Sequence, residues 1–362
     1  MPSTESVSHD DLILCTCGSQ EYTPRDAIEA ALFRGELNTN WNEFLRGVEA
    51  ERRADELDME IDDSAIADAA EVFRYEYDLI TAEETEAWLA TRGLTIDDFT
   101  DYFTRRYCAK NLTENIVPEQ IEYISATPEL RQLFLAELIL CGELDRMTTA
   151  LTFRLAARSA EKDSDSDTIT AEKRKFFDRN KVDPTQLPKW LKRLGRDSKW
   201  FDETVAMEAA FRRRCDTLLV PLARQRELVA LRLPLTRFDT EVIELESHDA
   251  AQEALFCVRE DGMSMEEVAI EGRYPYRRVD FLFEDIPTDM QQKFLSVSPG
   301  DVLEPVVRGD GFELCRIIKK IEPQADDPTV GLRVEQRILD RHFSELASKY
   351  TQRRLGAFTS AE

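Results

Sequence analysis

Apolar residues recur every three or four positions through the first two thirds of the chain, which is the spacing that places them on one face of a helix. Phe99, Phe103 and Tyr107 are an example, because each lies four residues from the next. Start signals accompany the spacing: Thr23 precedes Pro24, and a proline at the first helical position has no N–H group to leave unpaired. The pattern predicts helices throughout this region.

A partial repeat lies within the helical region. Four landmarks recur at an offset of 102 residues: a helix start at Thr81 and Asp183, a Trp-Leu pair at Trp88 and Trp190, a glycine stop at Gly93 and Gly195, and a phenylalanine at Phe99 and Phe201. Any two amphipathic helices share part of such a rhythm. If the four landmarks mark a true repeat, they predict two similar helical modules in which Trp88 and Trp190 occupy equivalent buried positions.

From about Pro234 the helical period gives way to shorter runs rich in β-forming residues. The segments "RFDTEVIEL" and "RRVDFLF" and the hairpin "LEPVVRGDGFELCRIIKKIEP" predict strands, and helical segments lie between them. The predicted order over residues 236–322 is β-α-α-β-α-β-β. A final helix follows, with Val330, Val334 and Ile338 on one face.

The chain is therefore expected to be α+β, with a mostly helical N-terminal region. Its predicted parts are a flexible N-terminal arm, disordered or strand-like (1–21), two helical modules (22–128 and 129–232), an α+β domain (236–322) and a C-terminal helix (328–350). The apolar stripe of that last helix needs cover, so we expect it to pack back on the helical region.

Charge narrows the range of partners. The 362 residues carry a net charge of −25, which disfavours nucleic acid, since phosphate contacts dominate that affinity. Residues 1–128 alone carry a net charge of −19. Such a surface attracts a basic peptide, or is only a solvated face.

The apolar runs, the N-terminal residues and the cysteines and histidines bear on the compartment and on the cofactors of the protein. It has no apolar run of the roughly 18–20 residues that span a membrane, and its N-terminus does not resemble a secretion signal, so we expect a cytoplasmic protein. Of the seven cysteines only Cys15 and Cys17 form a close pair, and the three histidines lie elsewhere in the sequence. We therefore expect no metal and no cofactor, and cysteines that are mostly buried.

Residues 236–322 resemble the parvulin family, the PpiC-type peptidyl-prolyl isomerases. The stretch "LSVSPGDVLEPVVRGDGFELCRI" is similar to the ending of that family, in its turn, Pro-Val strand, glycine corner and last strand. With long helices before it and one helix after it, the chain resembles the SurA-type chaperones. The resemblance implies a peptide or unfolded polypeptide as partner.

The resemblance also places residues. Parvulins carry two histidines on the floor of an apolar cradle, and this sequence has Glu241 and Glu313 at those positions. Two carboxylates on adjacent strands would repel unless one is protonated or an arginine, Arg316 or Arg237, lies between them.

The cradle itself keeps apolar residues. The resemblance assigns Ile286, Met290 and Phe312 to substrate binding, whereas Ile286 and Met290 also fit as ordinary core residues.

Three functions stay open at this point. The first is a non-catalytic, chaperone-like peptide-binding protein, whose partner in one form is the precursor of a ribosomally synthesised peptide during natural-product maturation. The second is an active peptidyl-prolyl isomerase, and the third is a new enzyme that uses Glu241 and Glu313 in acid–base chemistry. The sequence does not predict an oligomeric state.

Overall fold

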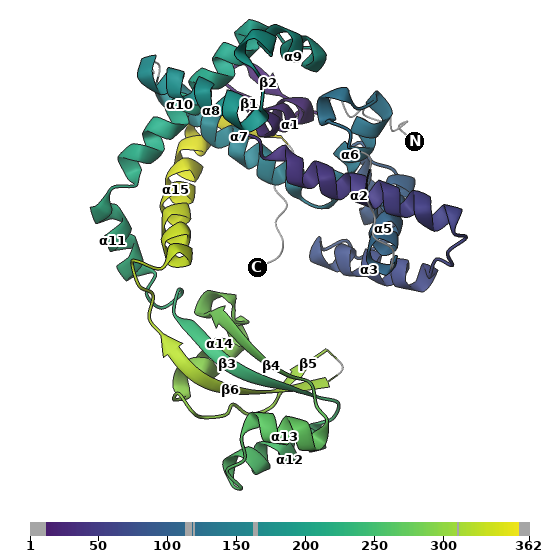
Figure 1. Cartoon of the computed structure of the whole chain (residues 1–362), viewed down its shortest axis with the longest axis vertical. Helices are drawn as coiled ribbons and strands as arrows, with labels where there is room; N and C mark the ends of the chain where they lie inside the picture. Colours follow the sequence, from purple (N-terminus) through teal and green to yellow (C-terminus); the bar gives the residue numbers. More distant parts are fainter. Residues whose placement is uncertain (1–11, 113–117, 119, 162–165, 310, 355–362) are drawn as a thin grey trace. The chain divides into compact units, whose positions relative to one another are not determined.

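The computed structural model describes residues 12–112, 118, 120–161, 166–309 and 311–354, and it divides into two compact units (Figure 1). The helical unit comprises residues 1–216 and 342–362, and the sheet unit comprises residues 217–341. Helices dominate the first, and the larger antiparallel sheet lies in the second. The expected α+β class is confirmed.

The helical unit contains ten helices in the described residues, followed by the end of the last helix, α15 (Pro328–Tyr350). In chain order they are α1 (Pro24–Phe33), α2 (Leu37–Glu56), α3 (Asp63–Glu76), α4 (Ala82–Ala90), α5 (Ile96–Asn111), α6 (Pro128–Leu140), α7 (Glu143–Ala160), α8 (Ser166–Asn180), α9 (Leu187–Leu194) and α10 (Ser198–Leu218).

Two predicted helix starts are present as capped ends. The Thr81 hydroxyl accepts a hydrogen bond from the Glu84 N–H at 3.1 Å, and the Glu84 carboxylate accepts one from the Thr81 N–H at 2.8 Å. Pro24 occupies the first turn of α1 behind Thr23. These contacts satisfy N–H groups that a helix cannot pair internally.

The contacts around the two tryptophans match. Trp88 lies edge-on to Phe73 at 5.5 Å between ring centroids, and Phe73 lies edge-on to Phe99 at 5.3 Å. In the second set, Trp190 lies edge-on to Phe176 at 5.2 Å, and Phe176 lies edge-on to Phe201 at 5.0 Å. Trp190 is buried and Trp88 is partly buried. The aromatic residues of the repeat are core residues in both copies.

A small sheet joins segments that are far apart in the sequence. Strand β1 (Cys15–Cys17) pairs antiparallel with β2 (Gln20–Tyr22) on one side and with β7 (Thr351–Arg353) on the other. Cys15 is fully buried, and burial raises the pKa of its thiol to about 11. The strand-like alternative for the N-terminal arm therefore describes residues 15–22, while residues 1–11 lie outside the described residues.

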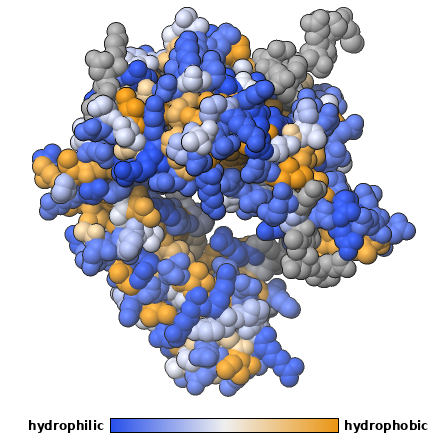
Figure 2. All heavy atoms as spheres, turned by 45° about the horizontal axis from the view of Figure 1, so that its top comes forward, coloured by the Kyte–Doolittle hydropathy of each residue, from blue (hydrophilic) through white to orange (hydrophobic). Residues whose placement is uncertain are grey.

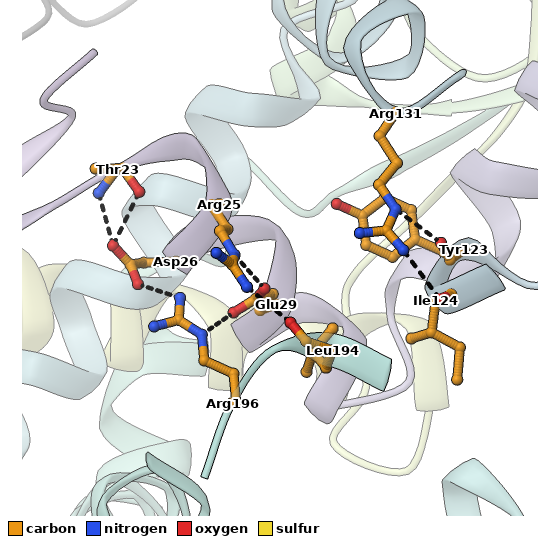
Figure 3. Close-up of polar contacts among 9 residues, drawn as sticks. All are labelled: Thr23, Arg25, Asp26, Glu29, Tyr123, Ile124, Arg131, Leu194 and Arg196. Atoms are coloured by element: carbon orange, nitrogen blue, oxygen red, sulfur yellow. Dashed lines mark hydrogen bonds and ion pairs between the residues drawn. The ribbon is translucent and has the colours of Figure 1, made fainter. Parts of the chain in front are cut away.

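A buried carboxylate ties α1 to the turn between α9 and α10 (Figure 3). Glu29 accepts hydrogen bonds from the Nε atoms of Arg25 and Arg196, and Arg25 also donates to the Leu194 carbonyl at 2.7 Å. Gly195 follows with φ +72°, and a Cβ there would lie 3.0 Å from Arg25 Nη2. A side chain at Gly195 would be strained and would crowd Arg25.

The last helix ends in the core of the helical unit. Phe343 is fully buried, with its ring stacked 5.6 Å from Phe153 of α7 and 4.6 Å from Phe211 of α10. Beside it, His342 Nε2 accepts a hydrogen bond from Arg214 Nε at 3.0 Å. This bond requires the neutral imidazole.

We expect acid to weaken the helical unit through His342. Burial lowers the pKa of His342 below 6.5, and the charges of Arg214 and Lys349 lower it further. The charge of Glu345 acts in the opposite direction but does not outweigh them. As pH falls, His342 is protonated in the unfolded chain before it is protonated in the folded chain. The stability that neutral His342 contributes is therefore fully present above the pKa of the unfolded chain, and it is lost as pH falls from there through the lower pKa of the folded chain. Between about pH 7 and about pH 5, the Tm should fall more in the wild type than in His342→Gln. Equal slopes would contradict the assignment.

The sheet unit has the predicted element order. It contains α11 (Pro221–Ala230), β3 (Arg237–Leu245), α12 (His248–Arg259), α13 (Met265–Gly272), β4 (Tyr276–Leu282), α14 (Thr288–Ser296), β5 (Val306–Arg308), β6 (Gly311–Ile321) and the first part of α15. The strands form one antiparallel sheet in the order β4-β3-β6-β5. Val330, Val334 and Ile338 share a buried cluster with Leu235.

Candidate functional site

Side chains of a strand alternate between the two faces of the sheet, and helices pack against both faces. Helices α12 and α13 cover the face that carries Ile243 and Leu314. Helix α14 covers part of the face that carries Phe238, Val242 and Ile317. We call these the α12 face and the α14 face.

Glu241 lies on the α12 face. It is 8% exposed, and its Oε1 accepts hydrogen bonds from Arg278 Nη2 and from the Tyr276 hydroxyl, each at 2.9 Å. Arg316 approaches Oε2 at 3.9 Å. The register explains these partners, since Glu241 lies opposite Arg278 on β4 and opposite Arg316 on β6.

Glu313 lies on the α14 face, opposite Glu244 of β3. Arg277 joins the two carboxylates, with Nη2 2.6 Å from Glu313 Oε1 and Nε 3.3 Å from Glu244 Oε1. Arg308 of β5 adds a second cation 3.5 Å from Glu313. We call these four residues the arginine–glutamate cluster.

The expected pairing of Glu241 with Glu313 is wrong. Glu313 faces Glu244, three residues along β3 from Glu241, and an odd offset along a strand places two side chains on opposite faces. Arg316 approaches Glu241 and also donates a hydrogen bond to the Gly300 carbonyl, and Arg237 lies beside Asp239 at 3.4 Å. A shared acid–base site of Glu241 and Glu313 is therefore excluded by their separation across the sheet.

Sequence reasoning missed Glu244, Arg277 and Arg308 as site residues. The signal was present in two neighbouring arginines, Arg277 and Arg278, in a segment predicted as a strand. Adjacent strand residues point to opposite faces, so one arginine was available for each glutamate.

The three predicted substrate-binding residues are not brought together. Ile286 and Met290 are 5% and 7% exposed, in the apolar cluster beneath α14. Phe312 lies on the α12 face, with its ring edge-on to His248 at 5.5 Å between centroids. The structure therefore places Ile286 and Met290 in the core.

The floor of the α14 face is apolar next to the arginine–glutamate cluster. Val242 and Cys315 lie there, and burial raises the pKa of the Cys315 thiol to about 12. The thiol is neutral at physiological pH and is a weak nucleophile in that state. This face combines an apolar floor with a rim of paired arginine and glutamate side chains.

An open depression of about 630 Å³ lies at the end of the sheet beside the cluster. Glu244, Glu313 and Arg308 line it together with Phe312 and the glycines of the β5–β6 turn. Gly311 is required there, because a Cβ would come within 2.7 Å of the Leu245 carbonyl oxygen. The turn can approach β3 this closely only without a side chain.

Strand β4 forms one edge of the sheet. Its seven residues pair with β3 alone in the described part of the chain, so its other side presents main-chain N–H and C=O groups. Strand β5 at the opposite edge has only three residues. An edge of the length of β4 can accept an extended peptide as a further strand.

The surface of the molecule is mixed in character. On the face in Figure 2 hydrophilic residues dominate, and hydrophobic residues form separate patches between them. Across the described residues, no three His, Cys, Asp or Glu side chains are grouped as a metal site. No helix in the same residues has the length and apolar character to cross a membrane.

Known proteins offer only distant likeness. No protein-family model matches the chain, and no curated protein matches its sequence. Peptidylprolyl isomerase PrsA from Bacillus cereus is a similar solved structure, with 13% identity, a TM-score of 0.35, and coverage of 65% of this chain and 90% of that chain.

Two further structures are more distant. Foldase protein PrsA from Lactococcus lactis has 11% identity and a TM-score of 0.27, and covers 96% of this chain and 97% of that chain. A structure from a study of PEB4 and Cj1289, two SurA-like chaperones of Campylobacter jejuni, has 8% identity and a TM-score of 0.20, and covers 62% of this chain and 89% of that chain. Likeness at these TM-scores carries no conclusion about function.

Proposed function

We propose that the chain is a chaperone-like polypeptide-binding protein of parvulin type that does not catalyse proline isomerisation. The arginine–glutamate cluster carries the proposal. It places two carboxylates and two guanidinium groups on the α14 face around Glu313, which is one of the two positions where the resemblance to parvulins implies a neutral histidine. Rotation about an X–Pro bond has a barrier of about 18–20 kcal/mol, and a rim of salt-bridged arginine and glutamate side chains does little to lower it.

Binding has its own support. The open side of β4 offers main-chain hydrogen bonds to an extended segment, and Arg277 and Arg278 offer charged contacts along the same strand. Charged side chains on an edge also limit pairing between copies of the sheet. The expected ligand is an extended, unfolded segment that pairs along β4.

The partner and compartment belong to the same proposal. A ribosomally made precursor peptide is one such unfolded partner, and a gene for a short precursor beside the gene for this chain would favour it. We also propose a cytoplasmic location, which suits seven cysteines that are all free thiols.

The test measures turnover and binding on the full chain. In a protease-coupled assay with an X-Pro tetrapeptide, we expect a rate within about twofold of the uncatalysed isomerisation, which takes tens of seconds or longer at 25 °C. A labelled unfolded polypeptide should bind, and its binding should slow amide hydrogen exchange in residues 276–282.

The controls separate catalysis from binding. Glu313→Ala should leave turnover at background, and α4 should show no change in exchange. Isomerisation well above background, retained in Glu313→Ala, would assign the function to an active isomerase. Binding without protection of β4 would place the peptide elsewhere and contradict the proposed mode.

A further inference from the structure

The ten helices of the helical unit form two sets of five in the same order. We call α1–α5 the first module and α6–α10 the second module. The first helix of each ends at a glycine followed by Glu-Leu, at Gly35 and at Gly142, and both glycines have positive φ. The fourth helix of each carries the Trp-Leu pair.

Several buried positions correspond between the modules. At an offset of 107, the buried residues Leu37, Trp41, Phe44, Leu45 and Ala50 of α2 correspond to the buried residues Leu144, Thr148, Leu151, Thr152 and Ala157 of α7. At an offset of 102, Phe99, Phe103 and Cys108 of α5 correspond to Phe201, Val205 and Ala210 of α10, all buried. The second and fifth helices therefore present corresponding faces to the core.

The first helix of each module packs against the helices of the other module. Phe134 of α6 packs against Trp41 of α2, with ring centroids 4.9 Å apart. Phe33 of α1 packs against Phe176 of α8 at 4.7 Å and against Phe201 of α10 at 5.8 Å. The groove formed by α2, α5 and α6 thus corresponds to the groove formed by α7, α10 and α1.

A helix of this chain packs against α7 and α10 of the second module. Phe343 of α15 is its anchor, fully buried between Phe153 of α7 and Phe211 of α10. At the module offsets, the residues that correspond to Phe153 and Phe211 are Arg46 of α2 and Ala109 of α5.

The first-module groove is open in the residues described. Arg46 and Ala109 line a cleft of about 980 Å³, together with apolar residues that include Phe44, Phe103 and Phe134. Ala109 is exposed there, whereas Phe211 is half-buried beneath Phe343. The cleft occupies the place that corresponds to the seat of α15.

The wall of the cleft holds a polar group without a partner. Arg105 is 2% exposed, and its Nη2 lies 3.2 Å from Glu137 Oε2. Its Nε is buried and has no hydrogen-bond acceptor among the residues that the structure describes. Arg105 therefore keeps one buried donor unpaired beside the cleft, which is costly.

We propose that the first-module cleft binds an amphipathic helix of a partner polypeptide, anchored by an aromatic side chain as α15 is anchored by Phe343. The partner helix carries a net positive charge, because residues 1–128 carry −19 and opposite charge favours encounter, whereas the four acidic and four basic residues that line the cleft itself balance. Helix-in-groove binding of this kind is independent of the strand addition proposed for β4.

The test uses a labelled peptide that copies residues 336–350 and the full chain. We expect binding with a Kd on the order of 10 μM, and at least about tenfold weaker binding of the peptide with Phe343→Ala. A peptide with Asp340→Lys and Glu345→Lys should bind more tightly. Protection from hydrogen exchange should appear in residues 40–47 and 103–111, and not in β4.

Matched protein variants locate the site. Ala109→Trp fills the cleft from an exposed position and should weaken peptide binding at least about tenfold, while Ala87→Trp, on the exposed side of α4, should not. Absence of peptide binding, or binding that Ala109→Trp leaves unchanged, would overturn the proposal. The proposal would also be overturned if the chain formed a concentration-dependent dimer that Ala109→Trp converts to monomer. The cleft would then be occupied by a second copy of the chain.

Discussion

Replacing Phe343 by alanine is expected to lower the free energy of unfolding of the helical unit by about 3–5 kcal/mol. The side chain is fully buried and its ring stacks on Phe153 and Phe211. Its removal loses the burial of a large apolar surface and leaves a cavity between two aromatic rings that are held by different helices. Urea unfolding followed by circular dichroism measures the change.

A control lies on the same helix. Leu332 is 69% exposed, so Leu332→Ala should change stability by no more than about 0.5 kcal/mol. If Phe343→Ala cost as little as Leu332→Ala, the end of α15 would not contribute to the core as its burial indicates. The role of Phe343 as an anchor would then lose its basis.

Replacing Glu29 by alanine is expected to cost about 2–4 kcal/mol. Glu29 is 2% exposed and lies between Arg25 and Arg196, which also holds Asp26 at 2.7 Å (Figure 3). Burial raises the pKa of Glu29 despite both arginines, so the carboxylate is costly to bury and the arginines would be costly to leave unpaired. Both guanidinium groups keep some exposure, which places the expected loss below that of a fully buried pair.

The comparison with glutamine separates charge from shape. Glu29→Gln keeps an acceptor oxygen and the side-chain volume, so we expect a loss of about 1 kcal/mol. Equal losses for the alanine and glutamine variants would show that charge, and not packing, sets the stability of this network. Glu86→Ala, at an exposed position of α4, gives the background.

Sequence reasoning predicted elements better than contacts. Thr81 with Glu84 and Thr23 with Pro24 gave correct helix starts, because a cap acts within one turn and its partners are neighbours in sequence. The order of elements in residues 236–322 was also correct. Periodicity and turn residues are local signals of this kind.

The candidate site depended on register, which is not local. Glu241 was expected to lie beside Glu313, but the register of β3 against β6 sets Glu244 opposite Glu313, and a shift of an odd number of residues changes the face. The ladder also contains an irregularity between Asp239 and Thr240. Such a shift leaves no trace in composition or period.

The small sheet was beyond prediction for a different reason. Strands β1 and β7 have three residues each and lie more than 330 positions apart, so neither carries a recognisable pattern by itself. Their pairing is a long-range event that depends on the helices around them.

The junction between β1 and β7 has a consequence for synthesis on the ribosome. Domains of a nascent chain usually fold in order from the N-terminus. Here the helical unit is made of residues from both sides of 217–341, and it needs Phe343 and Thr351–Arg353 to be complete. The unit whose translation begins first is therefore the one that is finished last, and the inserted sheet unit leaves the ribosome while its host still lacks a strand and an anchoring side chain.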